Sequence, residues 1–181
     1  MRFIRDVLGT SAVARPAINL STSFTTLAIA AGLIIPGQTF NPFADEVSFL
    51  LAAYIFEDVG VTAYAGAASS ITNPNYLTAA AAILGTEAYH AGAIRTLLSD
   101  IGAGAATNAI SALRATLSGE QDDMGTLLQT SGYTNAYNFI SNDINGLVFR
   151  RTTTQVLNIV YGGGAASNYL FFPNRLNGTI A

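Results

Sequence analysis

Two stretches of sequence decide how this chain folds: residues 56–64, FEDVGVTAY, and residues 87–95, EAYHAGAIR. Each lies in a longer segment, about 44–68 and about 74–99, in which apolar residues recur at spacings of three and four. That spacing is typical of a helix with one buried face. The stripe residues are Leu50, Ala53, Gly60 and Tyr64 in the first segment and Tyr76, Ala80, Ile83, Ile94 and Leu97 in the second.

Both segments carry the same helix start signal. Asn41-Pro42 precedes the first segment and Asn73-Pro74 precedes the second. In each pair a capping side chain stands before a proline ring that is already set at the helical φ. The second start leaves room only for a short turn centred near residue 72, so the two helices are predicted to run antiparallel and to pack side by side.

Three polar side chains fall within the two apolar stripes. Glu57 and Glu87 lie about equally far from the turn, and a helix rises ~1.5 Å per residue, so their carboxylates are predicted to face each other. His90 lies one turn beyond Glu87 on the same face. A buried carboxylate is costly without a cation, and neither stripe supplies a basic residue. Because glutamate and imidazole suit iron, manganese or zinc, we predict a metal site at these three residues.

A simpler interpretation of the same residues stays open. A Glu-x-x-His spacing is common by chance, and a single histidine on an apolar face is more often a hydrogen-bonded core residue than a ligand. His90 is the only histidine, so one chain offers no second imidazole. The nearby acids Asp58 and Glu46 fall off the stripe, and we expect them to be solvated or to cap a helix.

Composition limits the class of protein. The 181 residues are enough for a single domain, residues 1–181, with a substantial core. Only 10% of them are charged, against roughly 25% in an average soluble protein. The absence of cysteine excludes disulfides, thiolate metal sites and cysteine nucleophiles. With a net charge of −3 and no basic run, the chain lacks the positive patch that a nucleic-acid partner requires.

The N-terminal part offers neither a membrane span nor a signal peptide. Its longest apolar run, residues 27–35, is shorter than the roughly 18 residues needed to cross a bilayer and is closed by Pro36 and Gly37. Charged residues such as Arg5 and Asp6 interrupt the apolar run that should follow a signal-like start. We therefore expect no membrane span.

Shorter helices are predicted outside the two long segments. Residues 1–8 read as the last turns of a helix, and further helices are expected over about 24–31 and 107–117. From about residue 119 to 181 the Gly, Asn and Thr content predicts a loop-rich extension around one short helix at 154–161.

The two deciding stretches resemble the ferritin-like family that includes plant desiccation-related proteins and many bacterial relatives. The resemblance extends over essentially the whole chain, through four further segments: 14–18 (ARPAI), 41–43 (NPF), 155–161 (QVLNIVY) and 172–174 (FPN). It implies an all-α, ferritin-like helical bundle. In that family two earlier helices supply one Glu and a second Glu-x-x-His, and the sequence after that motif looks like residues 1–5, so one chain here holds an incomplete bundle.

The resemblance also implies roles for the three residues. Glu57 matches the carboxylate of the third bundle helix, and Glu87 with His90 matches the Glu-x-x-His motif of the fourth, which gives half a site per chain. Iron or manganese is the implied cofactor, zinc is an alternative, and the incomplete ligand set leaves open that none is bound. The missing half would come from a second copy, another chain, or helices upstream of the first residue shown.

Two functions follow as hypotheses. The first is a carboxylate-type metal-binding protein, redox-active or related to stress and desiccation, with an extracytoplasmic location implied by the family. The second is a structural or assembly subunit that uses the bundle as a scaffold without catalysis. Sparse charge and an apolar groove left open by two absent helices favour a homo-oligomer or another partner chain under either hypothesis. Whether the protein is an enzyme stays open.

Overall fold

The structure, a computed structural model, describes residues 2–121, 124–130, 133–163 and 169–176. Within these ranges the chain is an all-α assembly with one small hairpin, which confirms the predicted fold class. The helices are α1 (Arg2–Leu8), α2 (Thr22–Ala30), α3 (Glu46–Ala67), α4 (Pro74–Asp100), α5 (Gly104–Ser118) and α6 (Thr153–Tyr161), with single 3-10 turns at Gly9–Ser11 and Ala68–Ser70. The strands are β1 (Leu127–Thr130) and β2 (Tyr133–Tyr137).

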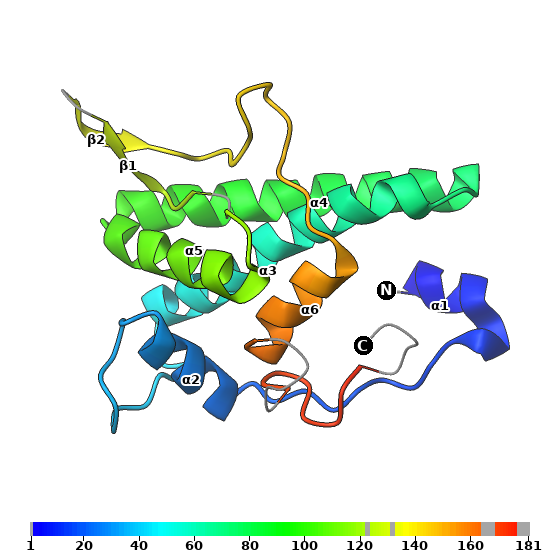
Figure 1. The fold of residues 1–181 in the computed structure, drawn as a ribbon, viewed down its shortest axis with the longest axis horizontal. Coiled ribbons are helices and arrows are strands. Elements are labelled where there is room, and N and C mark those ends of the chain that lie inside the picture. The colour runs from blue at the N-terminus through cyan, green and yellow to red at the C-terminus, as the bar shows by residue number, and fades with distance from the viewer. Residues whose placement is uncertain (1, 122–123, 131–132, 164–168, 177–181) are drawn as a thin grey trace.

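The two long helices, α3 and α4, lie side by side along the long axis of the molecule (Figure 1). Asn73 caps α4 as predicted, because its side chain accepts hydrogen bonds from two backbone N–H groups, and Pro74 stands in the first turn. The predicted range of about 44–68 agrees with α3 to within two residues, but the predicted capping signal at Asn41-Pro42 is too early. Asp45 caps that helix instead, accepting a 2.8 Å hydrogen bond from the backbone N–H of Ser48.

The main core lies to one side of this helix pair. There α2, α5, α6 and the segment around Phe171 pack against α3 (Figure 1). Phe24, Phe56 and Phe171 meet edge to face, with ring centroids 4.8 to 5.8 Å apart, the arrangement that aromatic rings prefer. These contacts fix which side of α3 is covered.

The covered side matches the predicted stripe only in part. The most buried part of α3 runs through Leu51, Tyr54, Ile55 and Val59; of the predicted stripe residues Leu50 is buried in the core, whereas Ala53, Gly60 and Tyr64 are only half-buried. On α4 the predicted stripe residues Tyr76 and Leu97 are 47% and 45% exposed, although Ala80 is buried and Ile94 packs against the core as predicted. The prediction was wrong here because α5 and α6 pack around the flank of α3, and periodicity alone does not say from which direction a partner arrives.

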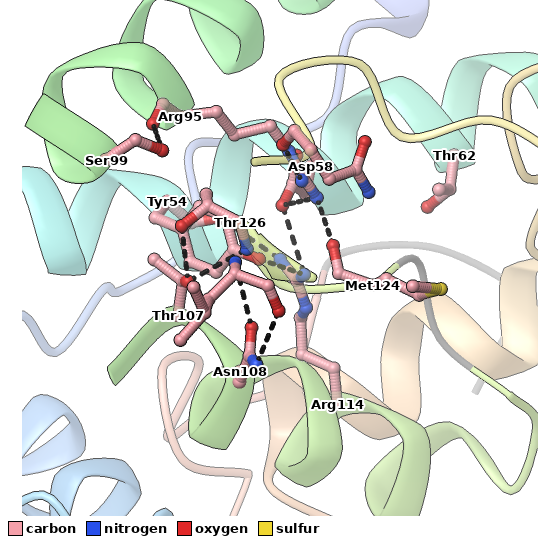
Figure 2. Close-up of polar contacts among 12 residues, drawn as sticks. Tyr54, Asp58, Thr62, Arg95, Ser99, Thr107, Asn108, Arg114, Met124 and Thr126 are labelled. Atoms are coloured by element: carbon pink, nitrogen blue, oxygen red, sulfur yellow. Dashed lines mark hydrogen bonds and ion pairs between the residues drawn. The ribbon is translucent and has the colours of Figure 1, made fainter. Parts of the chain in front are cut away.

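Asp58, expected to be solvated, is buried instead. Figure 2 shows it between two arginines, Arg95 from α4 and Arg114 from α5, with 3% of the aspartate side chain and 1% of each arginine exposed. Arg95 donates from Nε and Nη2 to the two carboxylate oxygens at 3.0 and 2.9 Å, and Arg114 Nη2 donates at 3.0 Å. Both guanidinium groups also lie over the ring of Tyr54. The expectation failed because the chain brings two cations to this carboxylate from distant helices.

Arg95 also holds the C-terminal third in place. Arg95 donates to the carbonyl oxygens of Met124 and Asn138, at 2.9 and 3.1 Å. A further anchor joins α3 to the segment before α6, where the backbone N–H of Arg151 donates to the carbonyl of Thr62. Gly66 permits that approach, since a Cβ at this position would lie 1.9 Å from the carbonyl oxygen of Arg151.

The loop-rich extension contains the one helix that was predicted and a hairpin that was not. α6 begins with a capping box between Thr152 and Gln155. β1 and β2 pair antiparallel with a register irregularity between Leu128 and Thr130. The polar, glycine-containing sequence of this hairpin carries little alternation of apolar residues, which is the usual signal for a strand.

One helix has the length and composition of a membrane span. The segment from α3 to Ser70 has a mean hydropathy of 1.3 in its most apolar 18-residue window, and half of that window is buried inside the fold. It contains the carboxylates of Glu57 and Asp58 and forms the centre of the protein core. We therefore describe α3 as a core helix, and no other helix of the described residues meets the same criteria.

Candidate metal centre

The structure brings the three predicted ligands together on the open side of the helix pair. Nδ1 of His90 lies 3.2 Å from Oε2 of Glu57, a hydrogen bond that Nδ1 donates when it carries the proton. The side chain of Glu87 lies close enough to that of Glu57 for the two carboxyl groups to affect each other's protonation. Glu57 therefore contacts both residues of the Glu-x-x-His motif on the neighbouring helix.

Gly60 makes room for Glu87. A Cβ built on Gly60 would lie 2.4 Å from Oε2 and 3.0 Å from Cδ of Glu87, closer than real side chains approach. Gly60 stands in the interior of α3, where glycine costs roughly 0.5–1 kcal/mol relative to alanine. The position of Gly60, almost one turn beyond Glu57 on the same stripe, could be read from the sequence. That Gly60 makes space for Glu87 could not, because this depends on where α4 packs.

Burial and the neighbouring carboxylate raise the pKa of Glu87. Partial burial is the largest cause, followed by the hydrogen bond to Glu57 and the negative charge of Glu57, and together they raise the pKa of Glu87 from 4.5 to about 7. The charge of His90 acts in the opposite direction. Two acids this close share a proton more easily than they carry two charges. The pKa of Tyr64 is raised as well, by burial and then by the charge of Glu87.

The site is more accessible than predicted. The side chain of Glu57 is 26% exposed and that of His90 is 56% exposed. Because Glu57 is partly exposed, water already offsets part of the cost of its charge, and a cation is needed less than at a fully buried carboxylate. A cation is favourable here because two carboxylates lie close together, although neither is fully buried.

The chemistry of the donor set fits a divalent transition metal in part. Two carboxylates and an imidazole are ligands of iron, manganese and zinc. The 3.2 Å between Glu57 and His90 is close to the separation of about 3 Å expected for neighbouring ligand atoms ~2.1 Å from one ion. Within the part of the chain that the structure describes, however, no group of three or more His, Asp or Glu side chains is arranged to hold a metal ion. The geometry is that of an incomplete site.

An apolar surface surrounds the three residues, and we call it the open face. Its members are half-buried or exposed and recur at spacings of three and four on both helices. They are Phe49, Ala53, Glu57, Gly60 and Tyr64 of α3 and Ile83, Glu87, His90 and Leu97 of α4. Glu46, at the start of α3, is exposed as expected and lies away from the three candidate ligands.

Comparisons with known proteins are consistent with a helical bundle built around α3 and α4. A family model described as a ferritin-like domain matches residues 1–100. "Ferritin-like catalase Nec2" of Nesocodon mauritianus is 31% identical over 92% of this chain, and "Desiccation-related protein PCC13-62" of Craterostigma plantagineum is 31% identical over 79%. The aligned regions cover 59% and 50% of those relatives, so the chain spans little more than half their length. The comparison with solved structures found no significant match.

Proposed function

Because this chain belongs to the ferritin-like domain family, we propose that it binds a divalent transition metal through Glu57, Glu87 and His90. These three residues match half of the ligand set of a carboxylate-bridged site in a helical bundle, and iron or manganese is the metal that they suit best, with zinc as a further candidate. A redox role in stress or desiccation tolerance is the wider function that we propose, in line with the name of the Craterostigma relative.

The contact of Glu57 with both Glu87 and His90 is the observation that supports this function most directly. A proton shared by two carboxylates occupies the place where a cation would be most favourable. A metal ion held by Glu57, Glu87 and His90 would take the place of the proton and of the hydrogen bond from the imidazole. Gly60 keeps Glu87 turned toward Glu57, because no side chain competes for that space.

Each residue has a separate task in this proposal. The two glutamates would supply negative charge and oxygen donors for a divalent cation, and the imidazole of His90 would supply a nitrogen donor. Bound iron or manganese would provide one-electron redox chemistry at an accessible position. The Nesocodon relative is named a catalase, so hydrogen peroxide is the first substrate to test with the metal-loaded protein.

Metal content and affinity test the proposal. We expect the purified chain to bind Mn²⁺ in an isothermal titration, and Glu57→Gln and His90→Ala to weaken binding at least tenfold. Glu46→Gln is the matched control, since it removes a carboxylate from the same helix away from the site. No binding by the wild type, or equal loss in the control, would refute the assignment of these ligands.

A scaffold role without catalysis is the second candidate. The direct hydrogen bond between Glu57 and His90 favours it, because side chains that satisfy each other need no ion. Large exposed apolar residues such as Phe43 and Ile144, at 67% and 100% exposure, are also suited to contacts with a partner. Elemental analysis separates the two functions: the scaffold role predicts no stoichiometric iron, manganese or zinc.

A further inference from the structure

We propose that a small cavity between α3, α4 and residues 139–149 binds a short alcohol or aldehyde, a molecule with one oxygen atom and one or two carbon atoms. Residues 139–149 belong to the segment that joins β2 to α6, and we call them the covering segment (Figure 1). The cavity is lined by residues other than the three candidate metal ligands. Binding there does not depend on metal.

The size of the cavity limits what it can hold. Its volume is about 60 Å³. An apolar cavity of about 150 Å³ holds benzene, with six carbon atoms, so this cavity suits a molecule of roughly two or three non-hydrogen atoms. Methanol, ethanol and acetaldehyde are within that limit. Sugars, nucleotides and amino acids are too large.

One hydroxyl group at the cavity lacks a hydrogen-bond partner. Ser141 lines the cavity, and its Oγ is buried but makes no hydrogen bond within the described part of the chain. Such atoms are rare, because a buried hydroxyl that has lost its water without a replacement destabilises the fold. An alcohol can donate to this oxygen or accept from it, and an aldehyde oxygen can accept from it. Either ligand would satisfy Ser141.

The other polar side chains at the cavity are already engaged. Asp58 accepts three hydrogen bonds from two arginines, and one of these, Arg95, also donates to two backbone carbonyls. Thr62 donates to a carbonyl oxygen of its own helix and accepts a hydrogen bond from Arg151. A ligand in the cavity therefore finds its polar contact at Ser141.

This arrangement favours a molecule with one polar end over water. A buried water molecule typically makes about three hydrogen bonds, and the cavity offers one unengaged hydroxyl. Most of the remaining wall is apolar, with Val61 and Ala91 on the helices and Phe139, Ile140, Val148 and Phe149 on the covering segment. An alcohol places its oxygen at Ser141 and its methyl or ethyl group against this wall, where burial of apolar surface stabilises it.

The covering segment can move to admit the ligand. It is anchored at one end by Arg95, which donates to the carbonyl oxygen of Asn138, and at the other by Arg151, whose N–H donates to the carbonyl of Thr62. Between these anchors, every hydrogen bond that the described structure gives to residues 139–149 joins two residues of the same segment. The segment can therefore lift from α3 and α4 without breaking a hydrogen bond to either helix.

A chemical-shift titration of the ¹⁵N-labelled chain with ethanol, in EDTA, tests the proposal. A ligand of three non-hydrogen atoms binds with a Kd no tighter than roughly 0.5 mM, so the titration extends to about 50 mM. We expect saturable shifts at the amides of residues 139–149 and at the adjoining positions of α3 and α4. Shifts that grow linearly over the whole chain would reveal only a cosolvent effect and would overturn the proposal.

Replacing Ser141 with alanine tests the polar contact. Ser141→Ala removes a hydroxyl that makes no internal hydrogen bond, so the fold should persist while the Kd for ethanol rises at least fivefold. Ser70→Ala is the matched control, because Ser70 is an exposed serine just beyond α3, and it should bind ethanol like the wild type. A Ser141→Ala protein that binds ethanol as tightly as the wild type would overturn the assignment.

A methyl group added at Gly92 tests the location. Gly92 lines the cavity, and its Cβ would lie 3.9 Å from the carbonyl oxygen of Phe139, an ordinary contact that the fold tolerates. We expect Gly92→Ala to lose ethanol binding, whereas Gly85→Ala, on the same helix with nothing within 4 Å of its Cβ, should keep it. Unchanged binding in Gly92→Ala would place the ligand elsewhere. In crystals soaked with ethanol, electron density for ethanol at Ser141 Oγ supports the site, and ordered water alone overturns it.

Discussion

Replacing Gly60 with alanine should weaken metal binding while leaving the fold intact or more stable. The new Cβ would lie 2.4 Å from Oε2 of Glu87, so that oxygen must retreat by about 1 Å to reach an ordinary contact distance of ~3.5 Å. The clash involves the end of a flexible side chain and no backbone atom of α4. Glu87 can therefore turn away from Glu57 without moving its helix.

Gly60→Ala should change the stability of the fold and the affinity for metal in opposite directions. Alanine in a helix interior is favoured over glycine by about 0.5–1 kcal/mol, so the free energy of unfolding of the metal-free protein should stay equal or rise. Displacing one carboxylate ligand should weaken Mn²⁺ binding roughly 10- to 100-fold, the range found when groups that orient metal ligands are removed. A tenfold loss corresponds to about 1.4 kcal/mol of binding free energy.

Gly85→Ala is the matched control. Gly85 lies in the interior of α4, and a Cβ there meets nothing within 4 Å. It should give a similar gain in stability without any loss of metal affinity. Urea denaturation in EDTA measures the first quantity, and isothermal titration with MnCl₂ measures the second. If Gly60→Ala binds Mn²⁺ as tightly as Gly85→Ala, Glu87 is not a ligand held by this contact, and the assignment of the site is wrong.

Three further predictions follow from the fold and the site. Asp58→Ala leaves two buried arginines without this carboxylate and should lower the free energy of unfolding in urea by about 3–5 kcal/mol, whereas exposed Glu46→Ala should change it by less than about 0.5 kcal/mol. The metal-free fold should lose stability as pH rises from about 4.5 to 7. The pKa of Glu87 is about 7 in the folded protein and 4.5 ordinarily, so over this range the unfolded chain releases the proton that the folded protein keeps. Urea midpoints measured in EDTA should show this fall in stability for the wild type and a flatter pH dependence for Glu87→Gln. Gly66→Ala should cost about 1–3 kcal/mol in the same assay, since its Cβ would press on the backbone carbonyl of Arg151, and an unchanged stability would contradict the close packing described here.

The positions of the helices were largely predictable because their signals are local. Asn73 and Pro74 mark the start of α4, and the apolar spacing beyond them continues to its end. The region of α6 was found for the same reason. The start of α3 was misplaced because the Asn-Pro pair before it has the same local chemistry as a helix cap, yet it forms a separate turn in which Asn41 binds the backbone N–H of Phe43.

The burial of Asp58 and its pairing with two arginines could not be predicted from the local sequence. Its partners Arg95 and Arg114 lie 37 and 56 residues away, and nothing in the local sequence indicates that two cations will meet this carboxylate. Sequence reasoning treats a charged residue off the apolar stripe as solvated, which is the common outcome for aspartate. The exception arises because α5 packs against α3 on the side where Asp58 lies, and long arginine side chains can cross that core.

The sequence by itself determined that this chain forms two long neighbouring helices and that Glu87 and His90 share one face of the second. Both follow from covalent geometry, because residues three apart on any helix are neighbours. Only the tertiary structure decided that Glu57 meets them, that Gly60 leaves the space for Glu87, and that the open face remains accessible. Those outcomes depend on the rotation of one helix against another, which is set by the packing of α2, α5 and α6 from the far side of α3 and not by any local pattern of residues.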